Sequence, residues 1–248
     1  MGLVFSYFIA MAAAAVVRRN RPGTTREAFN NWPDQPLADM DTTLAVQQFI
    51  QQGVRAHYAK LAELLAKKAS FASTEAYDEA VDREIELLLA LPELQDADVW
   101  QYEHLRQFCL ELNALVLLIQ DTCTPGSCPQ MKATDDLLYL CAAHKQPLEC
   151  SAIDYIVHTL DSIAAQLNSN KFFPSRVTIQ KTSVKHFQAI ARRLYRIFAH
   201  TYFHHRQVYD KFEEQTQLTS RFVKFAKQYD LVPESSMVIS HPSDGSSS

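Results

Sequence analysis

Two cysteines and three histidines in this 248-residue chain have the types and spacing that bind a metal ion. The segment CTPGSC places Cys123 and Cys128 in a turn with proline and glycine, where the backbone can direct two thiolates at one point. The segment HTYFHH supplies His200, His204 and His205. Two cysteines and two histidines at such spacings are typical ligands of tetrahedral structural zinc. The long stretch of chain between the pairs means that the site would join a loop to a distant helix.

The spacing leaves open which histidine completes the site. On an unbroken helix His200 and His204 lie about 40° apart, whereas His200 and His205 lie about 140° apart. Helical geometry therefore favours His204, and His205 can bind only if the helix bends or ends between them. The alternative interpretation is that these cysteines are buried apolar residues and the histidines lie on the surface. That interpretation is preferred for the other three cysteines, Cys109, Cys141 and Cys150.

Three arginines precede these histidines on the same expected helix. Apolar residues recur at helical spacing on its core face, at Phe187, Ile190, Leu194 and Phe198. Arg192, Arg193 and Arg196 fall on the opposite face, within about 100° of one another. No acidic residue three or four positions away on the helix balances their charge. The cluster is either a solvated basic face or a site for phosphate, whose geometry suits the guanidinium fork.

The composition limits the remaining possibilities. With 47% hydrophobic residues and only 5 glycines, the chain can bury one sizeable core and favours helix. A net charge of −4 gives no general attraction to nucleic acid, so no nucleic-acid partner is expected. Five cysteines, an odd number, argue against a disulfide framework and for a reducing, cytoplasmic location.

The N-terminus carries an apolar run, LVFSYFIAMAAAAVV, followed by RRNR. The run is shorter than the roughly 20 residues that a membrane helix needs, and no positive residue precedes it. MGLVFS also fits the myristoylation pattern with Gly2 exposed, and Met11 is an alternative start. We expect residues 1–17 to be a disordered apolar extension, and membrane association through it stays open.

The rest of the chain is expected to be an arm over residues 18–40, a helical domain over 41–232 and a disordered Ser-rich tail over 233–248. Periodicity and capping signals predict helices from Asp41 or Thr42, over 74–91, over 100–120, over 151–167, from Thr182 or Ser183, and from Leu218. The aliphatic segment LLYLCAAH is expected to be a strand, paired in a small β-hairpin with the segment around Met131.

Longer segments of the chain resemble the Mob family, most closely its striatin-associated phocein branch. These segments occur in the order RRNRPGT, NWPD, MDTTLAVQQFIQQ, YEHLRQFCLELN, CPQMKAT, LCAAHK, AIDYIVHTLD, LNSNKFFPSR and RRLYRIFAHTYFHHRQ. The resemblance covers Arg18 to about Val232 and implies a mostly α fold, a Mob-type helical bundle with one structural zinc. The apolar N-terminus, the acidic stretch around residues 67–90 and the tail depart from the family pattern.

The resemblance also implies site residues. The family pattern of Cys-x4-Cys with His-x4-His corresponds to Cys123, Cys128, His200 and His205, with a local break in the helix before His205. The basic pocket with which Mob proteins bind phosphothreonine peptides of kinases corresponds to Arg192, Arg193 and Arg196.

The function that the resemblance implies is that of an adaptor without catalytic activity. Such an adaptor docks phosphorylated kinase segments within an assembly of a striatin-type scaffold, protein phosphatase 2A and germinal-centre kinases. One alternative is a direct coactivator of NDR-type kinases. The acidic helix surface used by such coactivators corresponds here to Gln95, Val99 and Gln107, none of them charged.

A zinc hydrolase is the second alternative. Four protein ligands leave no open position for water, and the chain has no His-Glu-x-x-His sequence.

The apolar N-terminus is expected to be dispensable for folding, because the segments that resemble the family begin near Arg18. Deleting Met1–Ala10 should leave the melting temperature unchanged, as measured by circular dichroism. A large drop would mean that these residues pack as part of the core.

Overall fold

The computed structural model describes residues 22–25, 27–28 and 33–239. The predictions for residues 1–17, including acylation of Gly2, therefore lie outside the described residues. The chain divides into two compact units, Met1–Gln35 and Pro36–Ser248. In the described part of the first unit, a turn at Gly23 has a φ of 85°, a conformation that glycine adopts without strain.

The second unit is mostly helical, as the sequence predicts. The α-helices are α2 (Ala45–Ala66), α3 (Thr74–Leu89), α4 (Ala97–Ile119), α5 (Ala152–Leu167), α6 (Lys181–Val184), α7 (Phe187–His204), α8 (Arg206–Thr216) and α9 (Leu218–Gln228). Short 3₁₀ turns are η1 (Leu37–Asp39), η2 (Lys68–Ser70) and η3 (Glu234–Ser236). Among the helices of the described residues, none has the length and apolar character to span a membrane.

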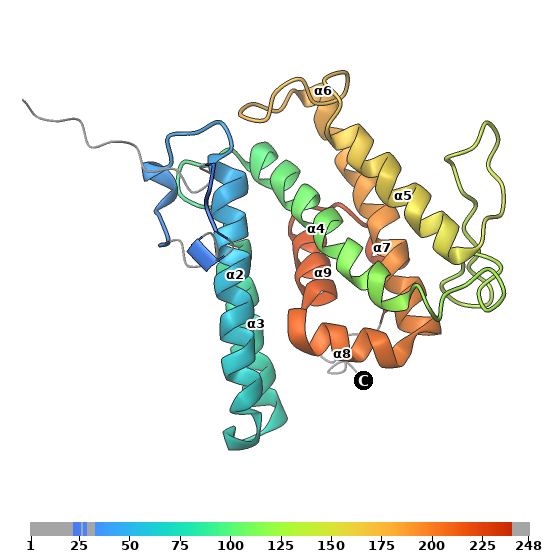
Figure 1. Cartoon of the computed structure of the whole chain (residues 1–248), viewed down its shortest axis with the longest axis horizontal. Helices are drawn as coiled ribbons and strands as arrows, with labels where there is room; N and C mark the ends of the chain where they lie inside the picture. Colours follow the sequence, from blue (N-terminus) through green and yellow to red (C-terminus); the bar gives the residue numbers. More distant parts are fainter. Residues whose placement is uncertain (1–21, 26, 29–32, 240–248) are drawn as a thin grey trace, which may run out of the picture. The chain divides into compact units, whose positions relative to one another are not determined.

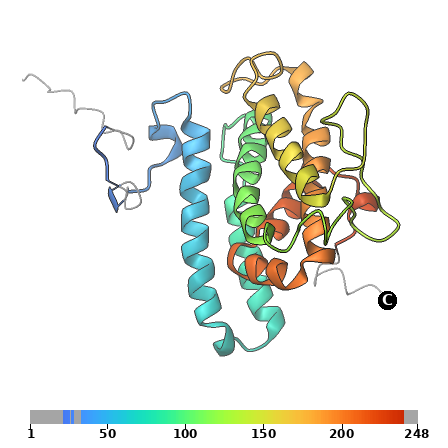
Figure 2. The ribbon, with the colours of Figure 1, turned by 45° about the vertical axis from the view of Figure 1, so that its right-hand side comes forward.

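Helix α4 is the centre of the second unit. It contacts α2, α5, α7, α8 and α9 (Figures 1 and 2), although Leu110, Leu117 and Leu118 on its outer face are more than half exposed. Leu105, Leu112 and Leu115 on this helix have no exposed surface. Each such side chain contributes about 1.5–3 kcal/mol by leaving water. The core around α4 therefore fixes the positions of α5 and α7, which carry the candidate site.

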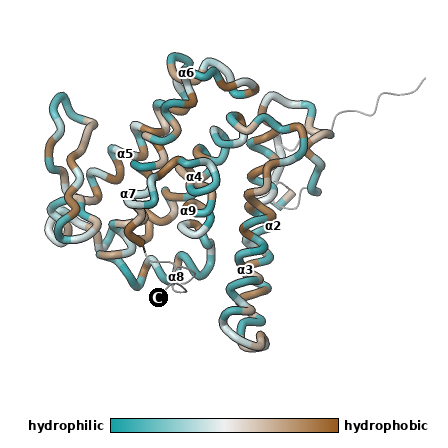
Figure 3. The backbone as a smooth tube through the Cα atoms, turned by 180° about the vertical axis from the view of Figure 1, so that it is seen from behind, coloured by the Kyte–Doolittle hydropathy of each residue, from teal (hydrophilic) through white to brown (hydrophobic). Residues whose placement is uncertain are grey.

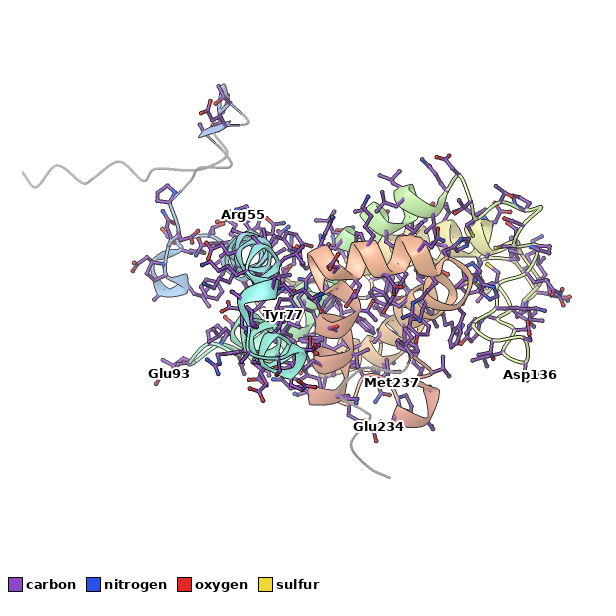
Figure 4. All side chains as sticks on the ribbon, turned by 90° about the horizontal axis from the view of Figure 1, so that it is seen from below. Arg55, Tyr77, Glu93, Asp136, Glu234 and Met237 are labelled. Carbon is purple, nitrogen blue, oxygen red and sulfur yellow. The ribbon has the colours of Figure 1, made fainter. Side chains whose placement is uncertain are left out.

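The helices around α4 are amphipathic, and along each of them hydrophobic and hydrophilic residues alternate (Figure 3). In α3, Tyr77, Val81 and Ile85 form a buried stripe toward α2, and Tyr77 is labelled in Figure 4. A β-carbon on Gly53 of α2 would lie 2.9 Å from Cδ1 of Leu88, so this glycine permits the close approach of α2 and α3.

The capping signal at Ser151 marks the start of α5, whereas the helix predicted from Asp41 or Thr42 begins only at Ala45 and has no side-chain cap. Ser151 accepts a hydrogen bond from the backbone N–H of Asp154 at 3.3 Å, and α5 covers the predicted range. The predicted long helix from Thr182 or Ser183 is wrong in its continuity, because α6 ends before α7 begins and α7 ends at His204. The predicted tail also begins too early, because Ile239 is buried and donates a hydrogen bond to the hydroxyl of Tyr195.

The predicted β-hairpin is not supported. The connection between α4 and α5 forms isolated antiparallel bridges, Lys132 with Leu138 and Cys141 with Leu148, and no regular strand is found in the part of the chain that the structure describes. Leu140, within the expected strand, is 48% exposed. A two-stranded hairpin needs packing on one face for stability, so the short aliphatic segment on which the prediction rested is not enough to form one here.

A buried ion pair joins three helices of the core. Arg221 of α9 contacts the carboxylate of Glu111 of α4 at 2.5 Å, and their side chains are only 2% and 9% exposed. The hydroxyl of Tyr58 of α2 donates a hydrogen bond to the same carboxylate. Burial acts to lower the pKa of Arg221, but Glu111 and Tyr58 raise it overall, so the guanidinium stays charged.

Replacing Glu111 with Ala should destabilise the fold by about 3–5 kcal/mol, because it leaves the Arg221 charge buried without a partner. The free energy of unfolding in urea measures the loss. The exposed pair of Lys60 and Glu63 serves as the control, and Glu63→Ala should cost less than about 1 kcal/mol. Equal effects of the two substitutions would contradict the role assigned to the buried pair.

Candidate functional site

The structure brings Cys123, Cys128, His200 and His205 together. One ligand atom from each of these side chains lies within 4.8 Å of the other three. Cys123 Sγ is 3.5 Å from His200 Nε2, and Cys128 Sγ is 3.6 Å from His205 Nε2. In a zinc tetrahedron with the usual metal–ligand bond lengths, the ligand atoms are about 3.3–3.8 Å apart. The donor types and their separations therefore fit zinc.

The two cysteines are held by the turn that follows α4. The backbone N–H of Cys123 donates to the carbonyl of Ile119 at 2.7 Å, so Cys123 extends the last turn of that helix. The backbone N–H of Cys128 donates to the carbonyl of Thr124 at 2.8 Å. The Ser127 hydroxyl closes the turn by donating to the carbonyl of Thr122 at 2.6 Å. These bonds curve the backbone so that both thiols face the end of α7.

The choice between the two histidines is decided by the end of α7. His205 has φ −132° and ψ 45°, which are not helical values, and it separates α7 from α8. The break turns the His205 ring toward Cys128. His204 is exposed, and its ring stacks on His200 with a centroid distance of 4.7 Å. The argument from an unbroken helix, which favoured His204, therefore fails because the helix ends one residue before His205.

Both histidines have partners for their other ring nitrogen. Nδ1 of His200 lies 2.8 Å from the carbonyl oxygen of Lys132, and Nδ1 of His205 lies 3.3 Å from the hydroxyl of Thr122. Such partners fix the tautomer of a metal ligand and orient its ring. Residue types and spacing could not identify Lys132, because its backbone oxygen rather than its side chain makes the contact.

Burial affects the cysteine and histidine groups of the site in opposite ways with respect to metal binding. Burial, reinforced by the neighbouring Cys128 thiol, raises the pKa of Cys123 to about 12. Burial also lowers the pKa of His200 to about 4, so its imidazole is neutral at pH 7. A metal must therefore displace the thiol protons, while the imidazoles are already in the ligand form. With four protein ligands, a bound ion would be structural rather than catalytic.

The arginines occupy a second part of α7. Arg192 is exposed, whereas Arg193 and Arg196 are half-buried toward α5. Arg193 donates to Gln166 Oε1 at 2.9 Å and to the Ser162 hydroxyl at 3.3 Å. Of the two alternatives for this cluster, a fully solvated basic face does not describe Arg193 and Arg196, because α5 partly covers both.

Arg196 is held by aromatic residues. It donates to the hydroxyl of Tyr155 at 2.8 Å, and its guanidinium lies 4.7 Å from the ring centroid of Tyr139. Among the described residues, no carboxylate forms a salt bridge with Arg193 or Arg196. Burial lowers the pKa of Arg193, and the charge of Arg196 acts in the same direction. Two partly desolvated positive charges are thus held close together by neutral partners.

Known proteins share much of this chain's sequence. Residues 78–240 match the Mob1/phocein family. The chain is 48% identical over 226 residues to the Drosophila melanogaster protein named MOB kinase activator-like 4, covering 91% of each chain. This chain belongs to the Mob1/phocein family. It is also 45% identical over 223 residues to the MOB-like protein phocein of Caenorhabditis elegans, covering 90% of this chain and 89% of that protein.

A more distant Mob protein is also similar. The maintenance of ploidy protein mob1 of Schizosaccharomyces pombe is 33% identical over 150 residues, which are 57% of this chain and 71% of that protein. The family resemblance inferred from the sequence segments is therefore confirmed.

In this member of the Mob1/phocein family, the three positions expected on a partner-binding acidic surface are poorly exposed. Val99 is 2% and Gln107 is 8% exposed, and Gln95 is half-buried. Gln107 donates a hydrogen bond to Glu111 Oε1 at 2.8 Å and so belongs to the core network. Neither Val99 nor Gln107 can present a charge to a partner without rearrangement of α4.

Metal analysis of ligand variants tests the site. His205→Ala and Cys128→Ser should each remove one equivalent of zinc per chain and lower the melting temperature, because metal binding would contribute to folding. His204→Ala is the matched control and should retain the metal. Inductively coupled plasma mass spectrometry gives the zinc content, and a chelator should destabilise the parent protein. Loss of zinc in His204→Ala with retention in His205→Ala would reverse the assignment.

Proposed function

We propose that this chain is an adaptor of the Mob/phocein type, without catalytic activity, that docks a phosphorylated kinase segment on α7. Family membership supports the adaptor class. The observation that carries the docking proposal is the pair of half-buried guanidiniums, Arg193 and Arg196, without a carboxylate partner among the described residues.

A phosphothreonine side chain fits this pair chemically. Phosphate carries close to two negative charges at pH 7 and has three acceptor oxygens, so it can neutralise both guanidiniums at once. Ser162, Gln166, Tyr139 and Tyr155 hold the arginines in place, which reduces the entropy lost when the phosphate binds. Arg192, one turn before Arg196 and exposed, would add a third donor at the rim of the pocket.

The proposed metal centre has a structural role in this function. Zinc bound by Cys123, Cys128, His200 and His205 would fix the start of the α4–α5 connection against the end of α7. The same connection carries Tyr139, whose ring lies beside Arg196. The metal would therefore hold one wall of the phosphate pocket, and no catalytic step is assigned to it.

The proposed setting is a cytoplasmic assembly containing a striatin-type scaffold, protein phosphatase 2A and germinal-centre kinases. It rests on the similarity to the phocein branch, including the Caenorhabditis elegans relative with that name. The alternative is direct activation of an NDR-type kinase; the Drosophila melanogaster relative is named kinase activator-like, without a kinase type. The uncharged, poorly exposed residues at Gln95, Val99 and Gln107 argue against it. Affinity purification followed by mass spectrometry separates the two by the partner recovered.

Peptide binding tests the docking proposal. A phosphothreonine peptide should bind the parent protein, and its unphosphorylated form should bind much more weakly, as measured by fluorescence anisotropy. Arg193→Gln and Arg196→Gln should each weaken binding by about 1.5–3 kcal/mol, since each removes a charge-assisted hydrogen bond. Substitution by Gln removes the charge while keeping a polar side chain beside α5.

An exposed arginine on another helix provides the control. Arg83→Gln on α3 makes the same change in net charge and should leave peptide affinity unaltered. Equal binding of the phosphorylated and unphosphorylated peptides by the parent protein would refute the pocket. Circular dichroism of each variant excludes unfolding as the cause of lost binding.

A further inference from the structure

A second group of cysteines and histidines lies in the connection between α4 and α5. It consists of Cys141, His144, Cys150 and His158, and one ligand atom of each lies within 4.8 Å of the other three. None of these four residues belongs to the centre formed by Cys123 and Cys128. The sequence favoured a packing role for Cys141 and Cys150. The structure instead places both thiols beside two histidines.

The distances within this group are close to those of a tetrahedral metal site. His144 Nε2 is 3.0 Å from Cys150 Sγ, and His158 Nδ1 is 3.6 Å from Cys141 Sγ and 3.9 Å from Cys150 Sγ. Ligand atoms around zinc are about 3.3–3.8 Å apart, so small side-chain movements bring all four to bonding distance. The rings of His144 and His158 are nearly perpendicular, at 82°, which lets both nitrogens point inward without stacking.

The local backbone explains how residues with irregular spacing converge. The antiparallel bridge between Cys141 and Leu148 closes a loop that contains His144, with backbone hydrogen bonds of 2.8 and 3.3 Å. Cys150 precedes Ser151, the N-cap of α5, and His158 lies two turns into that helix. The loop and the helix start therefore present two candidate ligands each, and none of the three contacts depends on a regular strand.

The chemistry of the donors favours zinc over other cations. Two thiolates and two imidazoles form a soft, mixed ligand set that suits tetrahedral zinc, and two thiolates balance the charge of Zn²⁺. All the cysteines of the chain are free thiols in this structure. We propose that Cys141, His144, Cys150 and His158 bind a second zinc ion, independently of the proposed docking function.

The connection between α4 and α5 has little regular secondary structure to hold it in place, and a metal cross-link would supply this restraint. It runs over residues 120–151 with only isolated bridges, and Figure 4 marks its outer part at Asp136. Connections of this length without secondary structure are uncommon in compact domains and are usually anchored or functional. The Cys123 and Cys128 site anchors the beginning of the connection, and the second site would anchor its end to α5.

The second site should exchange its metal faster than the first. His144 and His158 are only half-buried, whereas His200 is 1% exposed. His200 and His205 also have contacts that orient their second ring nitrogens, at 2.8 and 3.3 Å. For His144 and His158, no hydrogen bond of the second nitrogen is present among the described residues. A chelator therefore reaches the second ion more easily and meets less rigid ligands.

The decisive measurement is the metal content of the purified full-length chain, kept reduced. We expect two zinc ions per chain and a two-phase release of zinc to a chromogenic chelator. One zinc per chain would overturn the proposal, including the case in which Cys141 and Cys150 form a disulfide instead.

Variants assign the second ion to its ligands. Cys150→Ser and His158→Ala should each lower the content from two zinc ions to one and remove the fast phase of release. Cys109→Ser, a buried free cysteine on α4, is the matched control and should keep two. Two zinc ions retained in Cys150→Ser would also overturn the proposal.

If these variants do not fold, cobalt binding to the parent chain still tests for the second site. Co²⁺ replaces zinc, and each bound ion adds thiolate-to-metal charge-transfer absorption. Saturation of this absorption at two equivalents per chain supports the second site, and saturation at one refutes it.

Discussion

The break in the backbone at His205 is the constraint on which the candidate metal centre depends. Because α7 ends at His204, the next residue adopts non-helical angles and its ring turns back toward Cys128, 3.6 Å away. A continuous helix would place that ring about 140° from His200. The break therefore joins two segments far apart in the sequence, the turn after α4 and the junction of α7 with α8, in one group of four ligands.

The arginines depend on a different feature, the packing of α5 beside α7. Their charges are not balanced by acids of the described chain but are held by Ser162, Gln166 and Tyr155, all on α5. Neutral hydrogen-bond acceptors orient a guanidinium without cancelling its charge, so the attraction for an anion is retained. A solvated basic face would leave these side chains mobile, and binding would then cost more conformational entropy.

Much of the fold could be predicted from the sequence, because long periodic segments such as 152–167 carry both an apolar stripe and a capping signal. The candidate ligands Cys123, Cys128 and His200 followed from residue type and spacing, but His205 needed the family pattern. Helical periodicity contains no information about where a helix ends when the stop is not glycine or proline. The convergence of Cys141 with His158 depends on a bridge and a loop, which neither spacing nor alternation encodes.

Both clusters of cysteines and histidines include residues of the α4–α5 connection, which also carries Tyr139. Tyr139 lies between Cys128 and Cys141 in the sequence, and its ring lies beside Arg196. Its backbone is held by one hydrogen bond to Met131 at 2.8 Å, within a connection that lacks a regular sheet. Cross-links on either side of Tyr139 would limit the motion of this segment far more than isolated bridges do. The order of the pocket wall would then come from coordination chemistry, while the core around α4 positions the helices.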